Sequence, residues 1–272
     1  MFREVDNQSV FIYTGGRRFD PTLPVVVLIH GAGHDHSVWN FQARALAHHG
    51  LTVVAPDLPG HGRSPGPPLP DIESLATWID CLLDALDVRT ATIVGHSMGS
   101  LIALQYAASA GERVDRLILV GSVAPMPVAA PLLEAAARQP ARAHAMINQW
   151  SYTPAHRLGA SPVPGMVLAN VNQCIMERQP DKALATDLAA CNAYQGGLAA
   201  AESVTCPVAL ICGERDQMTP AKAARALHAA LANQAPDVRI ITLNGAGHAM
   251  MAEAPDQLSI AIRGFLSDYN KN

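Results

Sequence analysis

The stretch that decides the fold reads Ala91-Thr92-Ile93-Val94-Gly95-His96-Ser97-Met98-Gly99-Ser100-Leu101. Residues 91–94 favour a buried strand, and the Ala/Leu-rich run over 98–110 predicts a helix. A Gly-x-Ser-x-Gly segment between a strand and a helix is typical of a sharp turn that lifts the serine hydroxyl above a sheet. Ser97 could instead serve only as a helix cap, but the flanking strand and helix favour a nucleophile.

The same alternation of short strands and longer helices continues along the chain. We predict strands over 10–14, 25–30, 52–55, 91–94, 117–120, 208–212 and 238–243. Helices are predicted over 39–49, 72–86, 98–110, 220–232 and 255–269. This order predicts an α/β fold, with a mostly parallel, doubly wound sheet that is covered by helices on both faces.

One interval breaks this alternation. More than 80 residues separate the strand ending near Val120 from the strand starting at Val208, and 125–180 holds eight of the twenty prolines. Short helices interrupted by proline are expected there. We therefore predict an α/β core over 1–124 and 198–272, with an inserted helical segment over 125–197.

Composition excludes several classes of protein. The chain has 272 residues, 49% of them apolar, and a net charge of -4 without a block of like charges. Nucleic acid is therefore an unfavoured partner. The apolar runs are far shorter than a membrane span, and the first residues lack the apolar run of a secretory signal. Five cysteines without a Cys-x-x-Cys pair fit reduced thiols, so we expect a cytoplasmic protein.

A serine nucleophile needs a general base and an acid that orients the base. Of the eleven histidines, only His248 follows a Gly-bounded loop, Asn244-Gly245-Ala246-Gly247, directly after a late strand. Such loops lie at the carboxyl edge of a parallel sheet, beside the predicted turn at Ser97. We therefore assign His248 as the base.

The acid should leave the carboxyl end of a strand between the serine and the histidine. Asp216 does so in Cys212-Gly213-Glu214-Arg215-Asp216. Glu214 and Asp256 are the alternatives, but Glu214 is closer to the strand, and Asp256 follows Pro255 at a predicted helix start. The order of the predicted triad is then Ser97, Asp216, His248.

Attack on a carbonyl creates an oxyanion, which needs fixed backbone donors. The segment His30-Gly31-Ala32-Gly33 ends an early strand, and its glycines let the backbone approach a substrate. The amides of Ala32 and Met98 are expected to form the oxyanion hole. A simple chain reversal is the alternative for this glycine-rich turn.

Four motifs together resemble the α/β-hydrolase fold family, in its compact serine esterase branch with a helical cap. They are Gly95-His96-Ser97-Met98-Gly99, His30-Gly31-Ala32-Gly33, Pro56-Asp57-Leu58-Pro59-Gly60-His61-Gly62-Arg63-Ser64, and Gly247-His248 followed by Glu253-Ala254-Pro255 and Phe265-Leu266. The resemblance covers nearly the whole chain. It implies that the loop at Asp57 is structural, that His61 is not catalytic, and that 125–197 is the cap.

Departures from the family's branches narrow the chemistry. Dehalogenases and epoxide hydrolases place an aspartate where this chain has Ser97, and the His-Gly-Gly-Pro-Gly segment of proline iminopeptidases is absent. Hydrolases of carbon–carbon bonds often carry a bulky aromatic residue after the catalytic histidine, where this chain has Ala249. Hydrolysis of esters or thioesters, or acyl transfer, remains.

We therefore expect a cofactor-free serine hydrolase that acts on a small-molecule ester through an acyl-enzyme. A ligand receptor on the same fold, a lyase, an acyltransferase and a carbon–carbon hydrolase are the alternatives. His34 and His36 lie two residues apart, and two histidines alone fall short of a zinc ligand set, so we predict no metal site. Met126 and Trp150 are candidates for an apolar substrate pocket, although packing between cap helices is the alternative for such residues.

Overall fold

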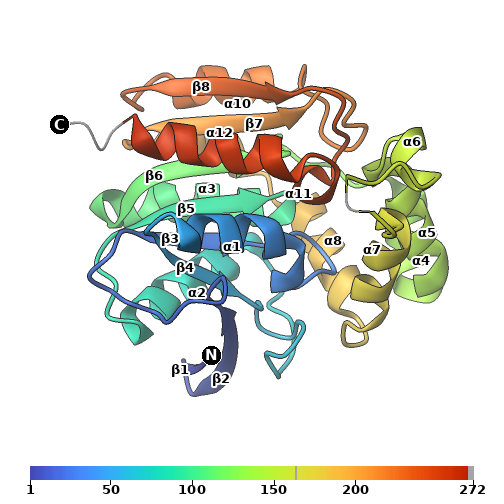
Figure 1. Cartoon of the computed structure of the whole chain (residues 1–272), viewed down its shortest axis with the longest axis horizontal. Coiled ribbons are helices and arrows are strands. Elements are labelled where there is room, and N and C mark those ends of the chain that lie inside the picture. Colours follow the sequence, from blue (N-terminus) through green and yellow to red (C-terminus); the bar gives the residue numbers. More distant parts are fainter. Residues whose placement is uncertain (163, 269–272) are drawn as a thin grey trace.

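In the computed structural model, which describes residues 1–162 and 164–268, eight strands form one sheet in the order β1-β2-β4-β3-β5-β6-β7-β8 (Figure 1). Strands β4 to β8 run parallel to β3, while β2 is antiparallel to both β1 and β4. This confirms the predicted, mostly parallel α/β sheet. The strands are β1 (Phe2–Val5), β2 (Gln8–Tyr13), β3 (Val25–Ile29), β4 (Thr52–Pro56), β5 (Ala91–His96), β6 (Val114–Val120), β7 (Val208–Gly213) and β8 (Val238–Leu243).

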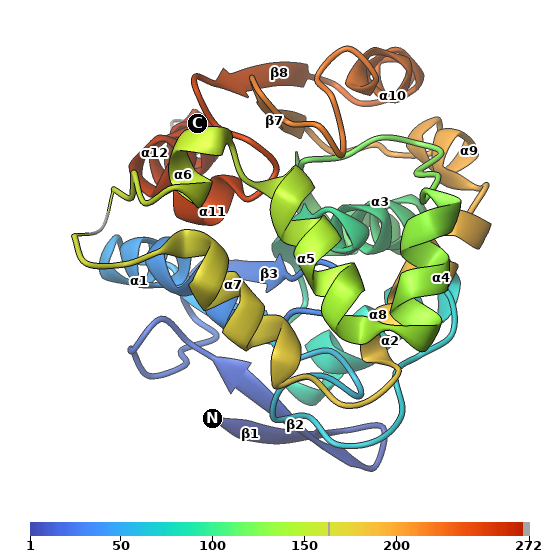
Figure 2. The ribbon, with the colours of Figure 1, turned by 90° about the vertical axis from the view of Figure 1, so that its right-hand side faces the viewer.

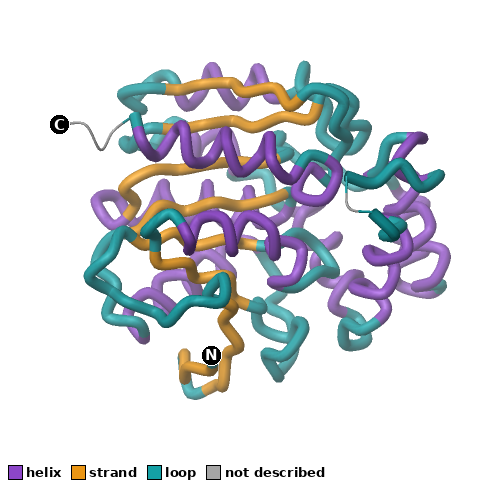
Figure 3. The backbone as a smooth tube through the Cα atoms, in the orientation of Figure 1, coloured by secondary structure: helices purple, strands orange, loops and turns teal. Residues whose placement is uncertain are grey.

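Helices cover both faces of the sheet (Figure 3). One apolar core lies between the sheet and α2, α3, α9 and α10, and a second lies between the opposite face and α1, α11 and α12. The central strands β3 and β5 are therefore buried at every position. These helices are α1 (Asn40–His48), α2 (Ile72–Ala85), α3 (Met98–Ala110), α9 (Gly197–Ala201), α10 (Ala224–Leu231), α11 (Met250–Glu253) and α12 (Pro255–Ser267), with 3-10 turns η1 (His36–Trp39) and η2 (Gly111–Arg113).

The sequence prediction differs from this architecture in a few places. Strand β1 was not predicted, because its residues Phe-Arg-Glu-Val are mostly exposed and carry little apolar pattern. The helix predicted over 220–232 begins only at Ala224, after a turn. Tyr269, the predicted end of the last helix, lies outside the described residues. Across 1–162 and 164–268, every helix is too short or too polar to cross a membrane.

The inserted segment forms short helices beyond the carboxyl ends of the strands, and Figure 2 looks onto them. Three begin with proline in their first turn, as predicted. Four of the inserted helices, α4, α5, α7 and α8, share an apolar cluster that includes Leu132, Ile147, Met176 and Leu188. The division into a core and a cap at residues 125 and 197 stays a prediction. The helices are α4 (Ala130–Arg138), α5 (Pro140–Ser151), α6 (Pro154–Arg157), α7 (Leu168–Glu177) and α8 (Ala183–Ala193).

Candidate active site

Ser97 stands at the tight turn between β5 and α3, with φ +54° and ψ -119°. The two glycines of the motif are needed because a Cβ on Gly95 would lie 2.0 Å from Gly99 O, and one on Gly99 would lie 2.4 Å from Ile29 O. Within the described residues, the Ser97 hydroxyl makes no capping bond to α3. This geometry does not support a role for Ser97 as a helix cap, and it leaves the hydroxyl available for chemistry.

His248 and Asp216 form a buried pair. His248 Nδ1 donates to Asp216 Oδ2 at 2.8 Å, and Thr219 Oγ1 donates to the same oxygen at 2.6 Å. The backbone amides of Met218 and Thr219 donate to Asp216 Oδ1. Burial would raise the pKa of Asp216, but the charge of His248 and these hydrogen bonds outweigh it and hold the pKa well below its usual range. Asp216 is therefore a carboxylate.

The backbone of His248 is held from two sides. Its N–H donates to Ser151 O at the end of α5, and its carbonyl accepts from His96 Nε2 at 3.0 Å. In the described part of the chain, His248 Nε2 has no hydrogen-bond partner, and Ser97 Oγ is not bonded to it. The nitrogen is thus available to Ser97 or to a substrate, because catalytic hydrogen bonds often tighten only when a substrate is bound.

The alternative acids lie elsewhere. Glu214 is exposed and accepts from the Gly245 N–H. Asp256 is also exposed, in the first turn of α12. Of the three candidate carboxylates, Asp216 is the one that the structure places on His248. Its catalytic role stays a prediction.

The glycine-rich turn after β3 lies against Ser97. A Cβ on Gly31 would be 3.3 Å from Ser97 Cβ, and both Gly31 and Ala32 line the same cavity as Ser97. The Met98 side chain is fully buried in the core, and its amide stands at the start of α3. Met98 thus adjoins Ser97 along the chain, and the turn that carries Ala32 lies against Ser97 in space. Their joint action on an oxyanion stays a prediction.

Ser97 and His248 line a cavity of about 700 Å³. Most of its other walls are apolar, and the predicted residues Met126 and Trp150 both belong to them. Sequence reasoning missed two further lining residues, Met218 in the loop after β7 and Met251 in α11. Further apolar lining from the inserted segment comes from Leu132, Ile147, Met166, Leu168, Ile175 and Leu188.

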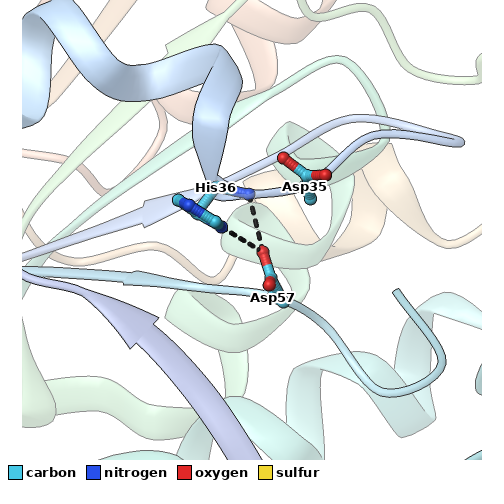
Figure 4. Close-up of side chains that lie close together, drawn as sticks. All are labelled: Asp35, His36 and Asp57. Carbon is cyan, nitrogen blue, oxygen red and sulfur yellow. Dashed lines mark hydrogen bonds and ion pairs between the residues drawn. The ribbon is translucent and has the colours of Figure 1, made fainter. Parts of the chain in front are cut away.

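One cluster among residues 1–162 and 164–268 has metal-ligand types close together, namely Asp35, His36 and Asp57 (Figure 4). His36 donates to Asp57 Oδ1 through both its backbone N–H and Nδ1, at 2.8 and 2.6 Å. The Asp35 carboxylate accepts from Arg178, Gln179 and Ser37. Because protein donors already occupy these oxygens, the arrangement favours a structural junction over a metal centre.

The loop after β4 is bonded throughout. Asp57 Oδ2 accepts from the Arg63 N–H, and His61 Nε2 lies 2.9 Å from Asp187 Oδ2 on α8. His61 and Asp187 are each 1% exposed, and neither lines the cavity. The loop therefore joins the core to the inserted helices. Sequence reasoning found the loop but not its partner Asp187.

Comparison with known proteins identifies a family for this chain. The sequence profile of the alpha/beta hydrolase family matches residues 26–261. A pimeloyl-[acyl-carrier protein] methyl ester esterase of Aromatoleum aromaticum is 31% identical over 259 residues, which is 88% of this chain and 96% of that protein. An uncharacterized protein of Mycobacterium tuberculosis is 40% identical over 116 residues, 42% of this chain, but the match spans only 34% of that relative's length.

The fold has close counterparts among solved structures. An enol-lactonase from Burkholderia xenovorans LB400 superposes with a TM-score of 0.84 at 23% identity, covering 98% of this chain and 100% of the lactonase. At this identity the likeness speaks for the fold alone.

Proposed function

Because the chain belongs to the alpha/beta hydrolase family, we propose that it is a serine hydrolase of carboxylic esters or thioesters with small to medium apolar acyl groups. The name of the relative from Aromatoleum aromaticum, a methyl ester esterase, supports an ester as the bond that is cleaved. The serine at the tight turn supports a covalent route through an acyl-enzyme.

In this proposal His248 is the general base. Its Nδ1–H is committed to Asp216, so the lone pair is on Nε2 and can take the Ser97 proton as Oγ attacks the carbonyl carbon. Asp216 is a carboxylate that accepts every one of these hydrogen bonds, which hold it in place. It therefore fixes the orientation of the His248 ring and balances the positive charge of the imidazolium that forms.

The amides of Ala32 and Met98 are the proposed donors to the oxyanion. The Met98 amide is at the N-terminus of α3, where the unpaired N–H groups of the helix favour negative charge. As the tetrahedral intermediate collapses, His248 returns the proton to the leaving alcohol or thiol. A water molecule activated by the same nitrogen then releases the acid and restores Ser97.

One observation carries the proposal: Ser97 and His248 share one cavity, and its remaining walls are mostly apolar. An acyl chain that enters this cavity is removed from water, which favours binding by about 0.8 kcal/mol per buried CH₂ group. Affinity should therefore rise with chain length until the cavity is full.

The test combines a fluorophosphonate probe with 4-nitrophenyl esters of acyl groups from two to twelve carbons. We expect the probe to label Ser97, Ser97→Ala to abolish labelling, and kcat/KM to rise from acetate to a medium chain by up to about fourfold per methylene. Labelling of another serine would overturn the assignment of the nucleophile. Labelling of Ser97 without turnover of any ester would favour a ligand receptor.

A matched pair of variants tests the cavity. Met126→Trp fills space in a lining position and should shift the preferred acyl chain to shorter lengths. Met176 packs in the apolar cluster of the inserted helices without lining the cavity, so Met176→Leu should leave the profile unchanged. A flat profile in the native protein, or a preference for charged acyl groups, would contradict an apolar acyl site.

A further inference from the structure

The peptide group that joins Ala32 to Gly33 is held at both of its polar atoms. Its N–H, on Gly33, donates to Asp187 Oδ2 at 2.8 Å. Its carbonyl, on Ala32, accepts from His34 Nδ1 at 2.7 Å, since a carbonyl oxygen has no proton to give. A peptide group is planar, so these two bonds fix its orientation, and with it ψ of Ala32 and φ of Gly33.

Asp187 reaches this peptide from α8 of the inserted segment. The helix packs directly on the turn, because a Cβ on Gly33 would lie 2.8 Å from Leu184 Cδ1. Asp187 is buried and is not part of the cavity wall, so a substrate in the cavity does not contact it. Its influence on chemistry must pass through the Gly33 N–H or through His61.

His61 is the second partner of the Asp187 Oδ2 oxygen. The two ring nitrogens of His61 face acceptors, Pro59 O at 3.0 Å and Asp187 Oδ2 at 2.9 Å, so the ring satisfies both only when it is doubly protonated. Burial lowers the pKa of His61, but the charge and hydrogen bond of Asp187 outweigh burial and raise it. The His61 ring and the Gly33 N–H thus both donate to the same oxygen of Asp187.

The other end of the peptide is also linked to the inserted helices. His34 Nε2 lies 2.8 Å from Asn172 Oδ1 on α7, and Asn172 Nδ2 donates to Asn148 Oδ1 on α5. The Ala32 carbonyl is therefore connected through His34 to α7 and α5, and the Gly33 N–H is bonded to α8.

From these contacts we propose that Asp187 is a positioning residue for the oxyanion hole: by holding the Gly33 N–H, it fixes the turn so that the Ala32 amide points to the substrate oxyanion. The inference rests on the proposed function of Ala32. The Ala32 amide and the clamped peptide meet at the Ala32 Cα, so a rotation of that peptide moves the donor. In this arrangement α8 completes the catalytic machinery in addition to covering the cavity.

A purely structural role for Asp187 would be to tie the inserted segment to the core. The structure offers a comparison for that role in Arg178, at the end of α7, which donates to Asp35 Oδ1 and Oδ2 at 2.7 and 2.8 Å. Asp35 lies on the same loop, two residues after Gly33. Loss of the Arg178 contact should loosen the same junction without touching the Ala32–Gly33 peptide.

The experiment compares Asp187→Ala, Asp187→Asn and Arg178→Gln, using a 4-nitrophenyl ester and its thiono analogue, with active sites counted by the fluorophosphonate probe. We expect Asp187→Ala to lower kcat about tenfold while KM changes less than twofold, because the donor is misplaced in the transition state. The asparagine oxygen still accepts from Gly33, so Asp187→Asn should recover most of kcat. Sulfur accepts hydrogen bonds poorly, so the preference for the oxygen ester should shrink in Asp187→Ala alone.

Arg178→Gln should keep kcat and the oxygen-to-sulfur preference of the native protein. If Asp187→Ala does not fold, the same comparison is made between Asp187→Leu and Asp187→Asn in a His61→Leu background, where no buried cation is left unpaired. Native kcat and native preference in Asp187→Ala or Asp187→Leu, with only a lower melting temperature, would overturn the proposal. So would equal losses in the alanine and asparagine variants. Failure of the native protein to label at Ser97 and turn over esters would instead overturn the proposed function.

Discussion

Residues 1–162 and 164–268 contain two buried histidine–aspartate pairs, and the N···O distances in the two pairs are almost identical. His248 is 2.8 Å from Asp216, and His61 is 2.9 Å from Asp187. His248 lines the cavity and, within the described residues, keeps Nε2 without a partner, whereas both nitrogens of His61 are occupied and its ring lies away from the cavity. A general base needs an unoccupied nitrogen that faces a substrate. The two pairs are therefore distinguished by the ring nitrogen that points away from the aspartate, and not by the nitrogen that bonds to it.

The largest effect is expected when the two histidines are substituted separately and their losses of activity are compared. His248→Ala should lower kcat/KM by about 10⁴-fold or more, because no group then takes the Ser97 proton. His61→Gln should keep kcat/KM within about tenfold, which matches the loss expected from a misplaced oxyanion donor. Steady-state kinetics on a 4-nitrophenyl ester decide between them, and a greater loss in His61→Gln would reverse the roles given to the two pairs.

The two aspartates should differ in the same way. Asp216→Asn favours the wrong tautomer of His248 and should lower kcat by about 10³–10⁴-fold. The exposed Glu214→Gln is the matched control two residues away and should change kcat less than about threefold. Should Glu214→Gln be the more damaging change, Asp216 would not be the orienting acid.

For folding stability, in contrast to activity, we expect the larger loss from substitution of His61. His61→Ala leaves the Asp187 carboxylate buried without its cation and should lower the free energy of unfolding by about 3–5 kcal/mol. His248→Ala opens onto an existing cavity and should cost about 1–2 kcal/mol. Urea unfolding of both variants compares the two values, and equal losses would mean that His61–Asp187 contributes no special stability.

The last prediction concerns the pH dependence of stability and His30, the neighbour of His61. The ring of His30 is centred 5.1 Å from that of His61, and burial, followed by the charge of His61, lowers the pKa of His30 to about 4. An unfolded histidine binds a proton near pH 6.5. Stability from His30 is therefore present above pH 6.5 and falls by up to about 3 kcal/mol as the pH drops toward 4.

The raised pKa of His61 acts with the opposite sign. Its contribution is fully present below pH 6.5, the unfolded value, and is lost as the pH rises through the raised folded pKa. The difference in unfolding free energy between the native protein and His61→Gln should narrow at alkaline pH, whereas His30→Gln should reduce the loss at acidic pH. The free energy of unfolding measured at pH 4.5, 6 and 9 tests both predictions. A change in the opposite direction with pH would contradict the pKa shift assigned to that histidine.

Local sequence signals account for most of the candidate site. Ser97 was found because its two glycines are required by backbone contacts within a few residues and against β3. His248 and Asp216 are predicted because each lies in the loop that follows a strand, and the carboxyl ends of parallel strands meet at one edge of the sheet. These signals are short in range, so one sequence suffices to read them.

Other parts depend on contacts that no local pattern encodes. Asp187 lies 126 residues from His61, in a helix whose sequence gives no sign of a buried carboxylate. Thr219, which bonds both Asp216 and His248, follows a loop of ordinary composition. The hydrogen-bond partners of these side chains depend on how the inserted helices pack against the carboxyl ends of the strands. The sequence pattern does not predict that packing.

The backbone of Ser97, with φ +54° and ψ -119°, is one that glycine adopts at ease and serine does not. A residue other than glycine in such a conformation costs about 1–3 kcal/mol. Laboratory evolution for heat resistance alone would therefore favour glycine at position 97 and erase the proposed nucleophile. Under the proposed function, serine at this position lowers thermal stability in exchange for catalysis.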